Sequence, residues 1–156
     1  MKNRKIMELF EQAKSHSACK NIRMAAVIET SSGEYIPGWN GPPKRAGEHP
    51  ECLLGGPITP ENIRQCPGVH AEVRAICRAA EMGISTKGAT LYLCEWYPCA
   101  PCALTLIEAG ISKLILLDDP NFTKDDCYNF KLAKEYLEKA GVTVKIRKAS
   151  GPDQDH

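Results

Sequence analysis

The strongest constraint on the fold is a near-continuous apolar strand pattern in the second half of the chain, KLILLDD, from Lys113 to Asp119. A strand with apolar residues at successive positions needs apolar surroundings on both sides, so both faces of its sheet must be covered. Helical patterns stand on either side of the run, at about 98–109 and 126–140. From residue 69 onward, helices and strands alternate, which predicts an α/β fold with helices on both faces of a sheet.

The remaining strands complete a mixed sheet. Segments 24–30 and 34–39 have strand patterns and are separated by the turn sequence Ser-Ser-Gly, which predicts an antiparallel hairpin. Pro37 makes the second of these an edge or bulged strand because proline has no N–H to pair. With further strands at 89–96, 113–119 and 142–147 and helices at 3–15 and 69–82, the prediction is a three-layer α/β/α fold around a mixed five-stranded sheet.

The length of the chain limits its domain organisation. The 156 residues suit one domain, 1–156, around one core. Within it, a long segment rich in Pro and Gly at about 41–68 predicts an insert, which in a compact domain is usually functional or held by something other than a core. The tail at about 149–156 is expected to fray.

Charge and apolar patterning exclude several classes of protein. The formal net charge is +1, which gives no general attraction to nucleic acid or anionic membranes. No apolar run approaches the roughly 18 residues of a membrane span. The amphipathic start, MKNRKIMELFEQAK, has no signal-peptide apolar region, so we expect a cytoplasmic protein. In a reducing compartment, eight cysteines indicate metal binding or catalysis before disulfides.

Two of these cysteines have the spacing of metal ligands. In YPCAPC, Cys99 and Cys102 are three residues apart and share one face of a helix that Pro98 opens. The unpaired N–H groups and the dipole at a helix N-terminus favour thiolates. A Cys-x-x-Cys that opens a helix is also typical of a redox pair. His70, at the start of the helix near 69–82, supplies a third ligand for zinc and leaves the fourth position open, as in catalytic zinc sites.

Glu72, two residues after His70, gives such a site a proton carrier. Zinc bound by two thiolates and one imidazole acidifies its water towards neutral pH. A carboxylate nearby can take the water's proton and return it to a leaving group. The pair therefore predicts an imidazole that binds metal and a carboxylate that moves protons.

These motifs identify the chain as similar to a known family. His70-x-Glu72 followed by Pro98-Cys99-x-x-Cys102 resembles the signature of zinc-dependent nucleobase deaminases. The resemblance is closest to the deoxycytidylate (dCMP) deaminase branch and covers roughly residues 5 to 147. The blocks that carry it are CKNIRMAAVI, GWNGPPK, VHAEVRAI, GATLYL and YPCAPCALTLIEAGISKLILL.

The resemblance implies a cytidine deaminase-like fold and a zinc-dependent hydrolysis, most specifically of dCMP to dUMP with release of ammonia. It assigns the sugar hydroxyl to Asn40 and the ring to backbone groups near Ala71 and Tyr97. Charge-assisted donors for a 5′-phosphate are expected in the same blocks. These candidates are Arg23 together with Lys44 or Arg45.

The chain departs from the family pattern in three places. Trp39 stands where Tyr is usual, and Arg74 stands where the branch usually has Asn or Gln. The connection between the strand at 89–96 and Pro98 is one residue longer than usual. A bulge there would shift residues 95–97 relative to the ring.

Other cysteines raise the question of a second metal. Cys19, His49, Cys52 and Cys66 fall in or near the insert, and a structural zinc would order a segment that has little apolar content. The resemblance also implies such a site. A disulfide between Cys52 and Cys66, or idle thiols, is the alternative interpretation.

Three functions compete on the sequence alone. The first is dCMP deamination, and the second is deamination of another base, nucleoside or modified nucleotide. Near-neutral charge argues against a nucleic-acid substrate, so a small nucleotide is the expected partner. The third is a non-catalytic, zinc-stabilised binding domain, against which Glu72 and the open ligand position argue. The resemblance further implies a homo-oligomer.

Overall fold

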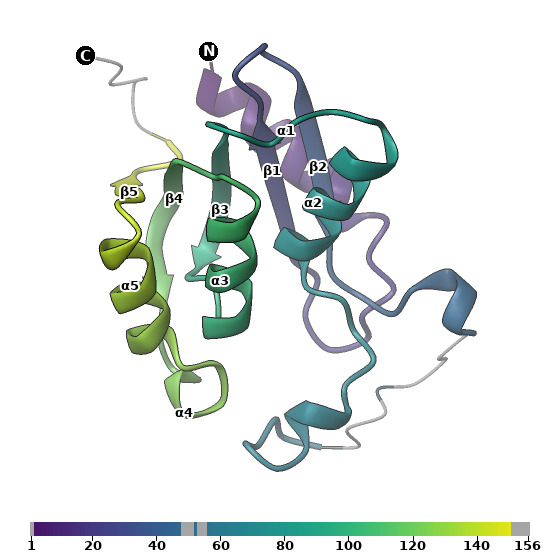
Figure 1. The fold of residues 1–156 in the computed structure, drawn as a ribbon. Helices are drawn as coiled ribbons and strands as arrows, with labels where there is room; N and C mark the ends of the chain where they lie inside the picture. The colour runs from purple at the N-terminus through teal and green to yellow at the C-terminus, as the bar shows by residue number, and fades with distance from the viewer. Residues whose placement is uncertain (1, 48–51, 53–55, 151–156) are drawn as a thin grey trace.

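The computed structural model describes residues 2–47, 52 and 56–150 of the chain. Its centre is a five-stranded sheet in the order β2-β1-β3-β4-β5 (Figure 1). β1 is antiparallel to β2 and β3, whereas β4 is parallel to β3 and β5, so the predicted mixed sheet is confirmed, with β2 at an edge. The strands are β1 (Ala25–Glu29), β2 (Tyr35–Trp39), β3 (Thr90–Trp96), β4 (Lys113–Asn121) and β5 (Thr143–Arg147).

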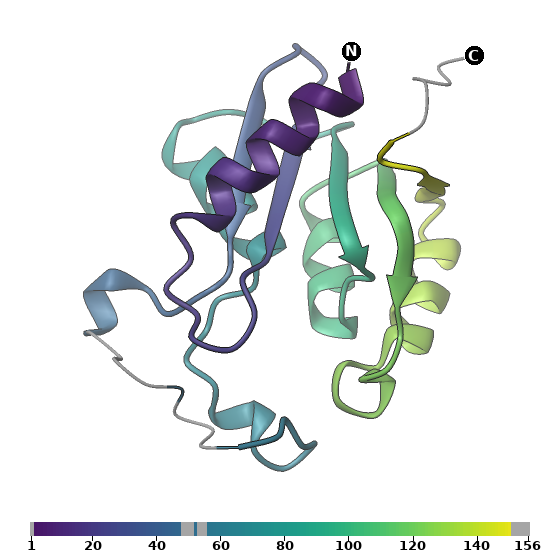
Figure 2. The same ribbon diagram turned by 180° about the vertical axis from the view of Figure 1, so that it is seen from behind.

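Helices cover both faces of this sheet, which confirms the three-layer prediction. Figure 2 shows α1 (Lys2–Lys14) across one face, while α2 (Ala71–Glu81), α3 (Ala100–Glu108) and α5 (Phe130–Lys139) lie on the other (Figure 1). The apolar residues of β4 pack against the helices on both faces of the sheet. Ile115 and Leu117 pack in the cluster with α1, and Leu114 and Leu116 pack in the cluster with α3 and α5.

The helix predicted at 126–140 is divided in two. A short α4 (Asp125–Tyr128) precedes α5, and Asn129 between them has φ 55° and ψ 53°, in the left-handed region. Asparagine adopts this region more readily than most residues because its side chain can bond locally. The break allows the Tyr128 and Phe130 rings to stack, with centroids 5.6 Å apart.

α2 packs very closely on β2 because Gly38 has no side chain. A Cβ at Gly38 would lie 2.3 Å from the carbonyl oxygen of Ala71 and 2.5 Å from the amide nitrogen of Ala75. Ala71 is the first residue of α2 and stands between His70 and Glu72. The glycine of β2 therefore sets the position of the helix end that carries the site.

The predicted bulge near residues 95–97 is present. The register of β3 against β4 shifts between Cys94 and Trp96, and Glu95 has a positive φ of 63°. At the C-terminus, the Ala149 amide donates to Asp118 at 3.0 Å, so the first residue of the tail is held against the sheet, while 151–156 lie outside the described residues. Among the helices that the structure describes, none has the length and apolar character to cross a bilayer.

Candidate metal centre and active site

Three metal-ligating side chains meet where α2 and α3 begin. His70 is the residue before α2, Cys99 is the residue before α3, and Cys102 lies in the first turn of α3. Their ligand atoms lie within 4.8 Å of one another. Within residues 2–47, 52 and 56–150, no other group of three or more His, Cys, Asp or Glu comes together in this way.

The spacing of the donor atoms fits zinc. His70 Nδ1 lies 3.4 Å from Cys99 Sγ and 3.3 Å from Cys102 Sγ. Usual zinc–sulfur and zinc–nitrogen bond lengths at a tetrahedral angle place the two ligand atoms about 3.6 Å apart. Both distances are close to that value. His70, Cys99 and Cys102 therefore form the catalytic zinc site, and three protein ligands leave a fourth position for water.

The local electrostatics favour the thiolate of Cys99, whereas the hydrogen bond to Cys99 and burial raise the pKa of the Cys102 thiol. A hydrogen bond from the Cys102 thiol and one from His70 hold the pKa of Cys99 well below its usual range, despite burial. The same contact with Cys99 raises the pKa of His70 to about 9. Both Cys99 and Cys102 lie at the positive end of the α3 dipole, which further stabilises a thiolate.

Glu72 lies in the first turn of α2 and is buried, with 5% of its surface exposed. Burial raises the pKa of the Glu72 carboxyl, and the nearby His70 opposes this effect. A buried carboxylate is costly unless a partner offsets its charge, and His70 is such a partner for Glu72. Glu72 lines the same cavity as His70 and Cys99, which is where a proton carrier must stand.

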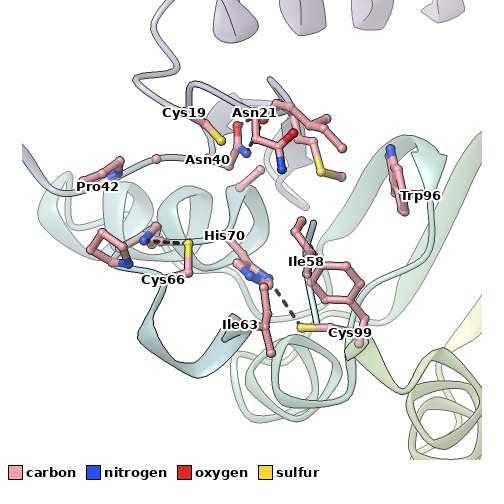
Figure 3. A pocket seen from close by; sticks show the side chains of 18 of the residues that line it. Cys19, Asn21, Asn40, Pro42, Ile58, Ile63, Cys66, His70, Trp96 and Cys99 are labelled. Atoms are coloured by element: carbon pink, nitrogen blue, oxygen red, sulfur yellow. Dashed lines mark hydrogen bonds between the residues drawn. The ribbon is translucent and has the colours of Figure 1, made fainter. Parts of the chain in front are cut away.

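The cavity above these residues is formed by segments that are far apart in sequence (Figure 3). Cys19, Asn21 and Asn40 face His70 and Cys99 across it, and the insert contributes Ile58, Ile63 and Cys66. Most of the lining is apolar with a few polar groups, as is usual for small-molecule sites. The insert therefore forms a wall of the site.

The sequence-predicted substrate residues fall into two groups. Asn40, Ala71 and Tyr97 line the cavity. Arg23, Lys44 and Arg45 do not line it; their residues are exposed, and the last two belong to a short 3-10 helix. Lys20, which the sequence analysis did not select, is the lysine that lines the cavity in the described part of the chain, where no arginine does so.

Asn40 is held by several hydrogen bonds. Its Oδ1 accepts from the Met24 amide at 2.7 Å and from Ser17 Oγ at 2.8 Å, and its Nδ2 donates to the Ile22 carbonyl at 2.7 Å. The single hydroxyl hydrogen of Ser17 is shared between Asn40 Oδ1 and the Asn40 carbonyl oxygen, which lies 2.7 Å from Ser17 Oγ. A carboxamide has two donor hydrogens, so one of them is left for a ligand.

Tyr128 and Phe130, two aromatic residues that the sequence analysis missed, form another wall together with Trp96. Tyr128 lies edge-on to His70, with ring centroids 6.1 Å apart, and Phe130 and Trp96 line the cavity beside it. The Tyr-Asn-Phe order could have indicated them, because asparagine breaks helices and would turn both rings to one side. Burial raises the pKa of Tyr97 and that of Tyr128 to about 12, so both phenols stay protonated near neutral pH.

The structure does not support the second metal site. Cys19, Cys52 and Cys66 line the cavity, but they belong to no group of three ligands in the described residues. All three are free thiols, so the alternative disulfide between Cys52 and Cys66 is absent too. His49, the fourth predicted ligand, lies outside the described residues. A single zinc site is therefore what the described residues hold.

Known proteins resemble the chain in sequence. The family model described as "Cytidine and deoxycytidylate deaminase zinc-binding region" matches residues 1–118. Deoxycytidylate deaminase of Saccharomyces cerevisiae is 29% identical over 144 residues, which cover 89% of this chain and 42% of that protein. ComE operon protein 2 of Bacillus subtilis is 30% identical over 130 residues, which cover 83% of this chain and 62% of that protein. The chain thus spans less than two thirds of each of these two relatives.

A solved structure has the same fold. It is the dCMP deaminase of the cyanophage S-TIM5 in complex with dCMP and dUMP, with a TM-score of 0.68 and 24% identity. The match covers 92% of this chain and 95% of the phage chain. The fold expected from the resemblance is confirmed by this likeness.

Proposed function

This chain belongs to the cytidine and deoxycytidylate deaminase family, a family of zinc-dependent deaminases, and on that premise we propose that it converts dCMP to dUMP with release of ammonia. The observation that carries the proposal is the buried Glu72 in the same cavity as His70 and Cys99 of the His70/Cys99/Cys102 triad. A purely structural zinc site would have no use for this carboxylate. The name of the yeast relative supports dCMP as the substrate.

The zinc site and Glu72 have separate roles in this reaction. When bound to the triad, zinc acidifies a water so that it can act as a nucleophile near neutral pH. Glu72 accepts one proton of the attacking water and delivers it to N3 of the cytosine ring. It then takes the second proton from the new C4 hydroxyl, which becomes the carbonyl, and gives it to the departing amino group. A C4–O bond forms, the C4–N bond breaks, and one water is consumed for each ammonia released.

The walls of the cavity suit a nucleotide. Backbone groups at Ala71 and Tyr97 hold the ring between apolar and aromatic surfaces, and the remaining Nδ2 hydrogen of Asn40 donates to the sugar hydroxyl. Lys20 takes the 5′-phosphate, because it is the lysine that lines the cavity in the described residues. Lys20 thus replaces Arg23, Lys44 and Arg45 as the proposed phosphate contact, while Ala71, Tyr97 and Asn40 keep their expected roles.

The test is a deamination panel with the zinc-loaded protein on dCMP, CMP, deoxycytidine, cytosine, AMP and guanine. We expect selective turnover of dCMP. Glu72→Gln should lower kcat by about 10²- to 10⁴-fold, because it removes the proton carrier, while bound zinc stays at one per chain. Glu81→Gln, on the exposed end of the same helix, is the matched control and should leave kcat unchanged.

Each outcome has a distinct meaning. Retained activity in zinc-loaded Glu72→Gln would rule out the proposed mechanism. Turnover of a different compound in the panel would keep the triad and Glu72 in their roles and reassign the walls of the cavity. No turnover of any compound at full zinc occupancy would contradict the proposed reaction.

A further inference from the structure

Gly41 is the point at which the walls of the cavity meet. Its amide donates to the Val69 carbonyl at 3.0 Å, and the Val69 amide donates to the Gly41 carbonyl at 2.9 Å. The two residues form an isolated antiparallel bridge that closes the insert at its base. Asn40 directly precedes one side of this bridge, and His70 directly follows the other. The bridge therefore joins the wall that carries Asn40 to the metal ligand.

Gly41 is also packed tightly from a third side. It has φ +134°, and a Cβ there would lie 3.0 Å from the Ala18 amide nitrogen and 3.2 Å from the Cys19 amide nitrogen. The segment that contains Ala18 and Cys19 is the third wall of the cavity. A shift of the Gly41 backbone would therefore displace three segments of the site, which are those of Asn40, of Val69 and His70, and of Ala18 and Cys19.

One side chain of α2 holds this junction. Arg74 Nη2 donates to the Gly41 carbonyl at 2.7 Å, so that oxygen accepts from both Arg74 and Val69. The guanidinium lies over the Trp39 ring, 5.6 Å from its centroid, which suits a cation–π contact. Arg74 itself is not among the residues that line the cavity. Any effect it has on a substrate must therefore pass through Gly41 and its neighbours.

Arg78 provides a natural comparison one turn further along α2. It also lies over Trp39, at 4.8 Å from the ring centroid, and also donates to a backbone carbonyl. That carbonyl belongs to Pro37, inside β2, rather than to the bridge. The two arginines thus make the same kinds of contact, and only Arg74 contacts the junction.

We propose that Arg74 is a positioning residue that clamps the Gly41–Val69 bridge and thereby keeps the Asn40 wall in register with His70 and Glu72. As a statement about substrate binding, the inference rests on the proposed function. As a statement about the bridge, it is independent of the substrate. An arginine suits this place because its planar guanidinium can donate to a carbonyl while it stacks on a ring.

The test compares zinc-loaded Arg74→Gln, Arg74→Lys and Arg78→Gln with the unchanged protein. NMR hydrogen exchange of the Gly41 and Val69 amides reads the bridge directly. A hydrogen bond from a charged donor is worth enough to change exchange by about tenfold, so we expect this acceleration in Arg74→Gln and none in Arg78→Gln. Arg74→Lys keeps a charged donor at this position and should restore part of the protection. In dCMP turnover, KM should rise about tenfold in Arg74→Gln, with kcat within about twofold.

Unchanged exchange at Gly41 and Val69 in Arg74→Gln would overturn the proposal. Equal acceleration in Arg74→Gln and Arg78→Gln would also overturn it, because it would reflect a general loss of stability. Faster exchange in Arg74→Gln alone, together with an unchanged KM, would refute the effect on substrate. If dCMP is not turned over at all, the proposed function fails, while the exchange result still decides whether Arg74 clamps the bridge.

Discussion

Lys20 shows how one side chain can decide between substrates. It is exposed, yet it stands on the cavity lining next to Cys19 and Asn21. A phosphate carries charge that a nucleoside lacks, so a cation at the rim of the cavity should strengthen the binding of dCMP and have no effect on the binding of deoxycytidine. We expect Lys20→Gln to lower kcat/KM for dCMP about tenfold, the low end of a charge-assisted hydrogen bond, and to leave deoxycytidine unaffected. Steady-state kinetics on the two compounds measures the difference.

Lys44→Gln is the matched control for this prediction, because it removes the same charge from an exposed 3-10 helix that does not reach the cavity. It should change neither reaction by more than about twofold, since exposed charges contribute little. If Lys44→Gln lowered kcat/KM for dCMP more than Lys20→Gln did, the phosphate contact would belong to the residues expected from the sequence and not to Lys20.

The contact between β2 and α2 is the element-scale feature on which the site depends. Gly38→Ala would place a Cβ 2.3 Å from the Ala71 carbonyl oxygen, which requires the backbone to move. We expect the free energy of unfolding to fall by about 3 kcal/mol, the upper part of the range for overpacking, and zinc affinity to weaken because His70 moves with the helix end. Urea denaturation and a zinc titration measure these two effects.

Gly56→Ala is the control, because a Cβ at Gly56 would meet nothing within 4 Å. Its effect on the free energy of unfolding should stay within about 0.5 kcal/mol. If Gly38→Ala were as mild as Gly56→Ala, the position of α2 would not depend on the glycine of β2.

Elements were predictable wherever a pattern of several residues defines them. The alternation of helices and strands and the covered apolar strand at 113–119 follow from such patterns, as does the His/Cys/Cys triad from its spacing. The bulge near Glu95 was expected from the family resemblance, because the connection before Pro98 is one residue longer than usual. Asn129 escaped prediction because the apolar spacing continues across it, and one left-handed residue leaves no periodic signal. Val69 was assigned to a helix for the same reason, although it pairs with Gly41 before α2 begins.

The cavity walls were less predictable because they depend on tertiary placement. Lys20, Arg23 and Lys44 are all exposed cations in or beside matching blocks, and nothing local distinguishes them. Only the position of each segment against α2 and α3 decides that Lys20 reaches the cavity. Cys19, Cys52 and Cys66 were assigned to a second metal by residue type and region, whereas ligands must also converge on one point, and among the described residues these three belong to no such group.

At the scale of the whole molecule, the zinc site joins the starts of two helices that pack in the same core cluster against the sheet. His70 belongs to the start of α2 and the two cysteines to the start of α3. These helices lie side by side on one face of the sheet (Figure 1). An ion bound by His70 and by both cysteines ties the two helix ends together, so its binding energy adds to the stability of the folded chain.

Removal of zinc should therefore lower the unfolding temperature. A ligand that binds only the folded state contributes about 4 kcal/mol at a free concentration of 1,000 times its Kd. For a chain of this size, each kcal/mol shifts Tm by about 2–4 °C, so we expect a fall of about 10 °C on chelation, restored by added zinc. Calorimetry with and without a chelator measures this fall in Tm.

Two cysteine variants test whether the stabilising metal is bound by the triad. Cys102→Ser should lose the response to chelator, whereas Cys77→Ser, which removes an exposed thiol from α2 outside the triad, should keep it. A full response in Cys102→Ser would place the stabilising metal somewhere other than the triad.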